Sequence, residues 1–205
     1  MVPGDAHALR RGRAAAQLLH RPRAAGVTEV VGRLLAVQAQ DLRAARLALR
    51  ARASGLTAAD VDVALTDERS LVVAWLGRGT LHLVGREDYP WLLALTAPTR
   101  FATSARRLGQ LGVGPGDADS AVREVERALA ADGPLTRPQL AERIAAKGIR
   151  TEGQAMPHLL RRAVLGGIAV LGPMRGAQQT VALARDWLGA RRRAPDQAHP
   201  DERCS

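Results

Sequence analysis

The sequence has few of the residues that stabilise small secreted domains or aromatic-rich sheets. It contains one cysteine, Cys204, which excludes a disulfide and a cysteine metal site within the chain. Aromatic residues make up 2% of the 205 residues, so the core must consist of Ala, Leu and Val, which favours packed helices. The longest apolar run, Leu71 to Leu76, is far shorter than the ~20 residues of a membrane-spanning helix.

Acidic residues are also scarce relative to basic ones. The chain has 30 Lys and Arg against 20 Asp and Glu, a net charge of +10 and a pI of about 11.4, and Lys147 is its only lysine. This excess predicts a nucleic-acid partner, because neutralised phosphates release their counterions. The N-terminus lacks the apolar stretch of a secretory signal, which predicts a cytoplasmic protein with no membrane contact.

Apolar periodicity predicts a mainly α fold with small β-hairpins, an α+β class made of two tandem winged-helix domains. In the second half, the order of helix, short helix, helix and hairpin is that of a winged helix. The first half repeats this order with one extra helix. The predicted segments are a loose N-terminus (1–8), a first winged-helix-like domain (9–108), a glycine-rich linker (109–117), a second winged-helix domain (118–188) and a disordered tail (189–205).

Helix ends are marked by capping residues and prolines. Five N-terminal signals are expected: Thr28, Asp41, Thr57 with Asp60, Thr136 with Gln139, and Thr151 with Gln154. Pro98 is expected to end a short helix at 89–96. Pro157 should kink its helix or move the start of that helix.

The segment Val37-Gln38-Ala39-Gln40-Asp41 gathers polar side chains at the join of two helices. In an extended or turn conformation, Gln38 and Gln40 lie on the same side of the chain, whereas in a continuous helix they diverge. Asp41 can cap the basic helix that follows. The same spacing also fits an ordinary polar connection between helices.

Basic side chains suggest a DNA-binding surface in the second domain. In a helix-turn-helix the second helix enters the major groove, and here that helix is 151–165, with Arg161 and Arg162. Arg175 lies at the wing tip, a position suited to phosphate or to the minor groove. The alternative is that these arginines form a solvated face.

The histidines give no metal site. His82 and His158 each lie among apolar residues, where a hydrogen-bonded structural histidine is commoner than a ligand, and no second His or Cys stands at ligand spacing. The sequence also lacks a Ser-His-Asp set, a phosphate loop and a dinucleotide fingerprint. No cofactor and no metal are therefore predicted.

Four segments, in this order, resemble the bacterial winged-helix DNA glycosylases of the AlkZ type over roughly 9–188: VQAQDLRAARLALRAR, VVAWLGRGTLHLVGREDYPWLL, LTRPQLAERIAAKGI and EGQAMPHLLRRAVLGGIAVLGP. The resemblance implies a metal-independent hydrolase that cleaves the N-glycosidic bond of alkylated purines, including interstrand crosslinks. The two catalytic glutamines of the family match Gln38 and Gln40. Relatives with Asp at the second position of this motif prefer simpler alkylated bases. With Gln40 at that position, the chain resembles the branch of the family that processes crosslinks.

The resemblance also implies partners and alternatives. The expected DNA contacts are Arg43, Arg46, Arg78, Arg161, Arg162 and Arg175. Family members have three tandem winged helices and a small β-barrel, and residues 189–205 contain no counterpart of the last two. The resemblance thus supports binding of double-stranded DNA, alkylated or crosslinked, at the nucleoid more than it supports catalysis. Faces that would meet the missing domains predict self-association. The alternatives are a non-enzymatic DNA-binding regulator or architectural protein, and a protein-interaction module.

Overall fold

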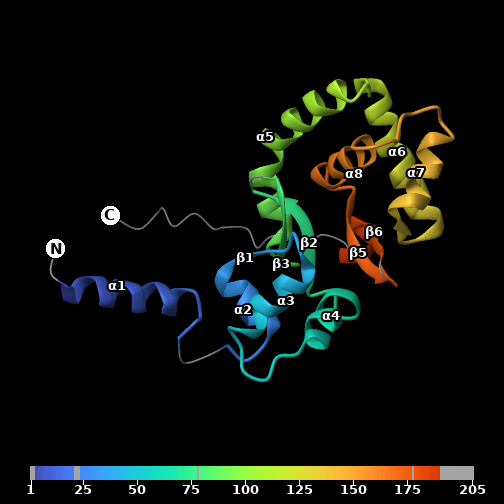
Figure 1. Cartoon of the computed structure of the whole chain (residues 1–205). Coiled ribbons are helices and arrows are strands. Elements are labelled where there is room, and N and C mark those ends of the chain that lie inside the picture. The colour runs from blue at the N-terminus through green and yellow to red at the C-terminus, as the bar shows by residue number, and fades with distance from the viewer. Residues whose placement is uncertain (1–2, 21–23, 78, 177, 190–205) are drawn as a thin grey trace, which may run out of the picture.

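The computed structural model describes residues 3–20, 24–77, 79–176 and 178–189. Its elements in chain order are α1 (Pro3–Ala16), α2 (Val27–Leu34), β1 (Ala36–Gln38), α3 (Leu42–Arg50), α4 (Ala58–Thr66), β2 (Leu71–Leu76), β3 (Thr80–Gly85), α5 (Tyr89–Gln110), α6 (Pro115–Asp132), β4 (Leu135–Thr136), α7 (Arg137–Ala145), α8 (Ala155–Leu165), β5 (Ala169–Arg175), β6 (Gln178–Leu183) and α9 (Ala184–Leu188). Figure 1 shows α5 running from the first half of the chain to the helices of the second, while α1 stands away from the body.

The two halves repeat one plan of six elements. In the first half α2, β1, α3, α4, β2 and β3 follow one another, and in the second α6, β4, α7, α8, β5 and β6 do the same. In both, the short strand after the first helix pairs with the last strand, β1 with β3 and β4 with β6. This is the element order of a winged helix. The predicted repeat is confirmed, with α1 as the extra helix of the first half.

Both predicted hairpins form, and together they make one sheet. Its strand order is β1-β3-β2-β5-β6-β4, and each pairing is antiparallel. The two hairpins meet through a single register pair, Val73 opposite Leu171. The second wing is longer than expected, because β5 continues to Arg175 past an irregularity between Leu171 and Met174. The sequence did not predict the short strands β1 and β4.

Two apolar clusters fill the interior. The smaller lies between one face of the β1-β3-β2 strands and α2, α3 and α4, and it includes Val30, Val31 and Leu49, each fully buried. The larger combines side chains of both halves, such as Val72 of β2 with Leu159 of α8. The halves therefore share a core as well as a sheet.

The predicted short helix at 89–96 is wrong, because α5 runs through Pro98 for 22 residues. A proline inside a helix costs about 3 kcal/mol. Burial on both sides of Pro98 offsets that cost: Leu92 and Leu93 are buried before it and Leu108 after it, each worth roughly 1.5–3 kcal/mol. Tertiary packing therefore outweighs the local break.

The predicted linker at 109–117 consists largely of helix. Residues 109–110 end α5 and residues 115–117 begin α6. Between them, Val113 is 2% exposed and its N–H donates to the Leu108 carbonyl at 2.9 Å. Gly112 has φ +78°, so the glycines make a tight packed turn rather than a flexible tether.

The chain ends differ from expectation in part. Residues 3–8, expected to be loose, begin α1, with Pro3 in its first turn. The predicted disordered tail lies outside the described residues from 190 onward. Pro157 falls in the first turn of α8, so that the helix starts at Ala155, as one of the two predicted outcomes.

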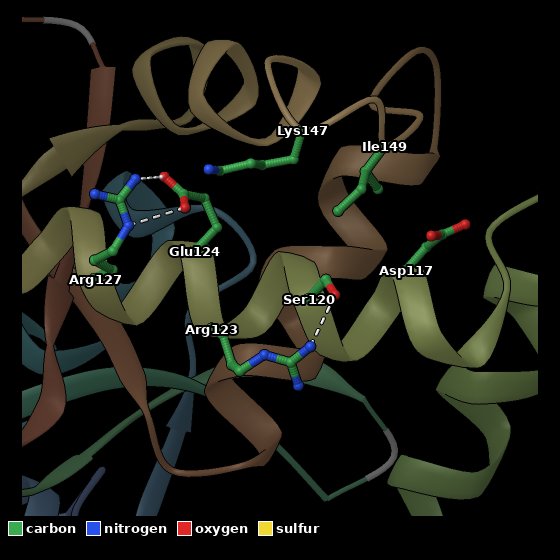
Figure 2. A pocket seen from close by; sticks show the side chains of 7 residues that line it. All are labelled: Asp117, Ser120, Arg123, Glu124, Arg127, Lys147 and Ile149. Atoms are coloured by element: carbon green, nitrogen blue, oxygen red, sulfur yellow. Dashed lines mark hydrogen bonds and ion pairs between the residues drawn. The ribbon is translucent and has the colours of Figure 1, made fainter.

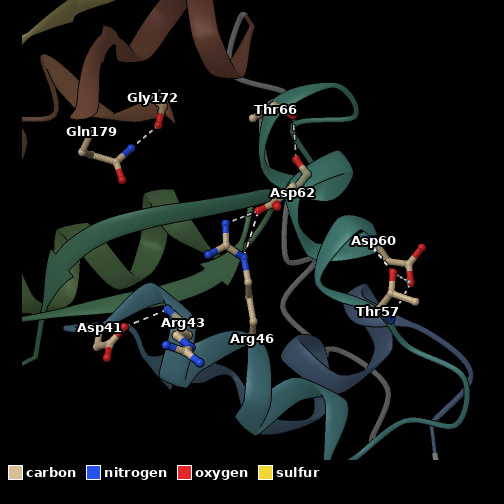
Figure 3. A network of polar contacts seen from close by, with 9 residues as sticks. All are labelled: Asp41, Arg43, Arg46, Thr57, Asp60, Asp62, Thr66, Gly172 and Gln179. Carbon is tan, nitrogen blue, oxygen red and sulfur yellow. Dashed lines mark hydrogen bonds and ion pairs between the residues drawn. The ribbon is translucent and has the colours of Figure 1, made fainter. Parts of the chain in front are cut away.

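Most capping predictions are confirmed. Thr57 Oγ1 accepts from the Asp60 N–H at 3.3 Å while Asp60 Oδ2 accepts from the Thr57 N–H at 2.7 Å (Figure 3). Gln139 Oε1 accepts from the Thr136 N–H at 2.9 Å. The box predicted at 151–154 is wrong, because α8 starts one residue after Gln154 without a side-chain cap. The cap predicted at Thr28 is wrong too, because α2 already begins at Val27, with Gly26 at its N-cap position.

Candidate functional site

The Gln38 and Gln40 side chains lie on one side of the chain, at the end of β1. Val37 is 8% exposed and Ala39 3%, both packed in the smaller core, whereas Gln38 and Gln40 are exposed. This alternation is the period of an extended strand. The prediction that both amides share a side is confirmed, and the segment is a strand end rather than a loose helix connection.

Strand β3 holds this segment in place. Gln38 stands opposite His82 in the antiparallel register, and the Ala39 N–H donates to the Leu81 carbonyl at 2.8 Å. The Leu81 N–H donates in turn to Gln40 Oε1 at 3.1 Å. Because an N–H can donate only to the oxygen of an amide, this contact fixes which way the Gln40 amide is turned. Its NH₂ group therefore remains as the donating end.

Asp41 is a helix cap, as the sequence predicted. Its Oδ1 accepts from the Arg43 N–H at 2.8 Å and from the Ala44 N–H at 3.3 Å, at the start of α3 (Figure 3). Two free N–H groups of the first turn are satisfied in this way. The carboxylate is thus engaged in holding the turn that follows the two amides.

His82 lies opposite Gln38 on the neighbouring strand, although only a structural role was predicted for it. Opposite residues of an antiparallel pair project from the same face, so His82 and Gln38 are neighbours. His82 Nδ1 lies 3.0 Å from the Thr80 carbonyl oxygen. A carbonyl only accepts, so Nδ1 carries the proton of this contact and Nε2 stays available. The alternation at 80–84 signalled the face of this ring, but only the strand pairing shows its neighbour.

The described residues contain no group of three His, Cys, Asp or Glu side chains placed to hold a metal ion. None of the helices in the described ranges is long and apolar enough to cross a membrane.

The arginines predicted on α3 have different surroundings. Arg43 is exposed, and so is Arg50, two turns further along the same face. Arg46 is directed to the protein instead: its side chain is 22% exposed and pairs with Asp62 of α4, with Nε to Oδ1 at 3.0 Å (Figure 3). Arg78 lies outside the described residues.

The arginines of α8 do not form the open surface expected of a groove-reading helix. Most of α8 is buried, and Arg162 is tied to Asp119 of α6 at 2.7 Å and stacks on Phe101 of α5 at 4.2 Å. Only 11% of the Arg162 side chain is exposed, which leaves little surface for a phosphate. Arg161 is half-buried against the β2–β3 turn. The reason is that the second part of α5 covers this face.

Arg175 is exposed at the end of β5 and tied to the protein at one side. Its Nη2 donates to the Pro134 carbonyl at 2.9 Å and its Nη1 lies 3.4 Å from Gln139 Oε1. The wing-tip position is as predicted, and the remaining donors of the guanidinium face outward from these two contacts.

A shallow cavity of about 390 Å³ lies beside α6, away from these residues. Figure 2 shows its lining: Asp117, Ser120, Arg123, Glu124, Arg127, Lys147 and Ile149. Glu124 is 5% exposed and forms a two-point ion pair with Arg127, at 2.6 and 3.1 Å. Arg123 donates to Ser120 at 2.8 Å. Glu124 and Arg127 thus neutralise each other, and the cavity contains none of the predicted site residues.

Comparisons with a family model, a curated protein and a solved structure give consistent matches. A family model described as "DNA glycosylase AlkZ-like" matches residues 31–204. An interstrand DNA cross-link repair glycosylase of Streptomyces sahachiroi is 33% identical over 184 residues, which are 84% of this chain and 48% of that protein. The solved structure of the Streptomyces sahachiroi DNA glycosylase AlkZ matches with a TM-score of 0.69 and 29% identity, over 87% of this chain and 49% of that one. The chain spans about half the length of both relatives. It belongs to the AlkZ-like DNA glycosylase family.

Proposed function

We propose that this protein binds double-stranded DNA and hydrolyses the N-glycosidic bond of alkylated purines, including those joined in interstrand crosslinks. The observation that supports this most is the exposure of Gln38 and Gln40 on one side of β1. These are the positions at which the family resemblance implies catalytic glutamines. Both amides are open to a ligand, and neither is buried as a structural residue would be.

The chemistry suits neutral amides. An N7-alkylated purine carries a positive charge, so it leaves with the bonding electrons of C1′–N9 as a neutral base. A water oxygen forms the new bond to C1′ and gives up a proton to solvent. An amide cannot take that proton at neutral pH, but it can hold the water by hydrogen bonds. The proposed role of Gln38 and Gln40 is therefore to position the water against C1′.

The two amides contribute differently. The carbonyl oxygen of Gln40 is engaged by the Leu81 N–H, so Gln40 offers mainly its NH₂ group to the water oxygen. The described residues give the Gln38 side chain no hydrogen-bond partner, and both its ends are open to the water. His82, opposite Gln38, adds Nε2 to the same face.

Two exposed arginines on the helix that follows the glutamine segment suit a DNA backbone. Arg43 and Arg50 are exposed on α3, directly after the glutamine segment, and the whole chain carries +10. Exposed guanidinium groups bind phosphate and position a duplex without reading its sequence. Arg43 and Arg50 are therefore the proposed backbone contacts of the first half.

The test is release of 7-methylguanine from a methylated duplex under single-turnover conditions. Gln38→Ala and Gln40→Ala are each expected to slow release by roughly 10²-fold, the usual effect of losing one positioned group. The matched control is Gln154→Ala, an exposed glutamine at the start of α8. Equal rates in all variants would contradict the proposal.

The same assay decides between hydrolysis and binding alone. A wild-type protein that binds the duplex with a steep salt dependence but releases no base would be a non-enzymatic DNA-binding module. Self-association and a nucleoid location stay predictions.

A further inference from the structure

Two arginines from outside the hairpin contact the β2–β3 turn. Arg100 of α5 donates from Nε to the Gly77 carbonyl at 2.9 Å. The Arg161 guanidinium of α8 lies so close to Gly79 that a Cβ at this position would overlap it. Both glycines have positive φ, +50° and +89°, so the turn needs glycine for its backbone and, at Gly79, for the approach of Arg161. Side chains of α5 and α8 thus contact the turn of a hairpin that belongs to the first half.

Within the described part of the chain, the charge beside this turn is positive and has no carboxylate paired with it. Among the ion pairs of the described residues, none includes Arg100 or Arg161. Arg161 Nε is buried and, within the described part of the chain, has no hydrogen-bond partner. Burial, and then the charge of Arg100, lowers the pKa of Arg161. Burial lowers the pKa of the adjacent His158 too, followed by the charges of Arg161 and Arg107.

We propose that Arg100 and Arg161 form a phosphate site at the β2–β3 turn, and that its ligand is a phosphodiester of the DNA strand whose sugar faces Gln38 and Gln40. A phosphate suits this arrangement because guanidinium groups donate to its oxygens in pairs and because an anion relieves the repulsion of two cations. Arg100 uses one of its five donors on Gly77, so donors remain for the ligand. The identity of the DNA strand rests on the proposed function.

The turn lies within a short reach of the amides. Strand β3 leaves the turn at Thr80, and its next residues, Leu81 and His82, are those that contact Gln40 and stand opposite Gln38. Three residues of strand span roughly 10 Å. Successive phosphates of one DNA strand advance about 3.4 Å along the helix axis. A phosphate held at the turn therefore belongs to a nucleotide within about three of the one at the amides.

The experiment measures the salt dependence of binding to an unmodified duplex of about 20 bp by fluorescence anisotropy. One phosphate contact contributes ≈ 0.9 to the slope of log K against log salt, which is about 8-fold in Kd near 0.1 M salt. Arg100→Gln/Arg161→Gln is expected to reduce the slope by about that amount. The matched control, Arg106→Gln/Arg123→Gln, removes the same charge from two exposed sites on α5 and α6 and is expected to keep the slope.

Further variants separate phosphate binding from support of the turn. Arg100→Lys/Arg161→Lys keeps the charge but loses the Nε contact to Gly77, so a phosphate site predicts a slope near that of wild type. Gly79→Ala displaces Arg161 without changing the charge, and its slope is expected to fall. If Arg100→Gln/Arg161→Gln is unfolded at the assay temperature, these two variants test the phosphate site in its place.

Three results would overturn the phosphate site: wild-type protein that does not bind the duplex, a slope for the glutamine pair equal to that of its control, or a lysine pair as weak as the glutamine pair. Base release is measured separately. Protein that releases no base but loses slope on Arg100 and Arg161 substitution would keep the phosphate site and refute the glycosylase proposal. Protein that releases base with an unchanged slope would do the opposite.

Discussion

Substitution of Gln38 and of Gln40 is expected to affect the rate of base release and the stability of the fold to different extents. Gln40 accepts a hydrogen bond from the Leu81 N–H, and Gln38 has no partner within the described residues. Loss of one hydrogen bond reduces the free energy of unfolding by about 0.5–1.5 kcal/mol, which lowers Tm by roughly 2–4 °C per kcal/mol in a chain of this size. Gln40→Ala is therefore expected to lower Tm by a few degrees, and Gln38→Ala is expected to leave Tm unchanged.

Both substitutions are expected to slow base release alike. A loss of roughly 10²-fold corresponds to ~2.7 kcal/mol of transition-state stabilisation, more than the hydrogen bond to Leu81 contributes to folding. The assay pairs single-turnover release of 7-methylguanine with a calorimetric Tm on the same preparation. Gln40→Glu offers a further check, because a carboxylate keeps the acceptor for Leu81 but loses the NH₂ donor, so stability should recover while the rate does not.

Two results would contradict the proposed role of Gln38. A Gln38→Ala protein that releases base at the wild-type rate would remove Gln38 from the reaction. A Gln38→Ala protein whose Tm falls together with its rate of base release would mean that the Gln38 side chain stabilises the fold and does not position the water.

Three other outcomes are expected. His82→Asn should slow base release by roughly 10-fold or more while the duplex affinity is kept, since His82 stands opposite Gln38 in the strand register and is not one of the proposed phosphate contacts; an unchanged rate would leave His82 structural. Arg127→Ala should lower Tm more than Glu124→Gln does, because it leaves a buried carboxylate unpaired, whereas Glu124→Gln leaves an exposed guanidinium; the opposite order in calorimetry would contradict this. Burial is the main cause that lowers the pKa of His158 in the folded protein, so the unfolded chain binds a proton at higher pH than the folded protein does. The free energy of unfolding of the wild type should therefore fall as the pH drops below about 6.5. Urea unfolding of His158→Gln should show a smaller fall over the same pH range.

Local signals in the sequence predicted local structure well. The Asp41 cap, the box of Thr57 with Asp60, and the two hairpins depend on residues close together in the chain, and all of them form. The common side of Gln38 and Gln40 followed from a spacing of two in an extended segment.

The main errors share one cause. Pro98 was expected to end a helix, so residues 97–108 were assigned no element, and Arg161 and Arg162 were assigned to an open face. In the structure these same residues form the second part of α5 and pack on α8, where Phe101 covers Arg162. Contacts between segments about 60 residues apart leave no periodic trace in either segment. The neighbourhoods of His82 and Arg100 were missed for the same reason.

The doubled plan of this chain puts the same join, short strand to second helix, at both ends of the sheet, and the two copies use it in opposite ways. In the second copy β4 leads straight into α7, and the amide of Gln139 caps the N-terminus of α7 by accepting from the Thr136 N–H. In the first copy residues 39–41 intervene between β1 and α3, and an aspartate takes over the closing task. The Asp41 cap leaves Gln38 and Gln40 without a part in starting the helix, although the carbonyl oxygen of Gln40 still accepts from the Leu81 N–H.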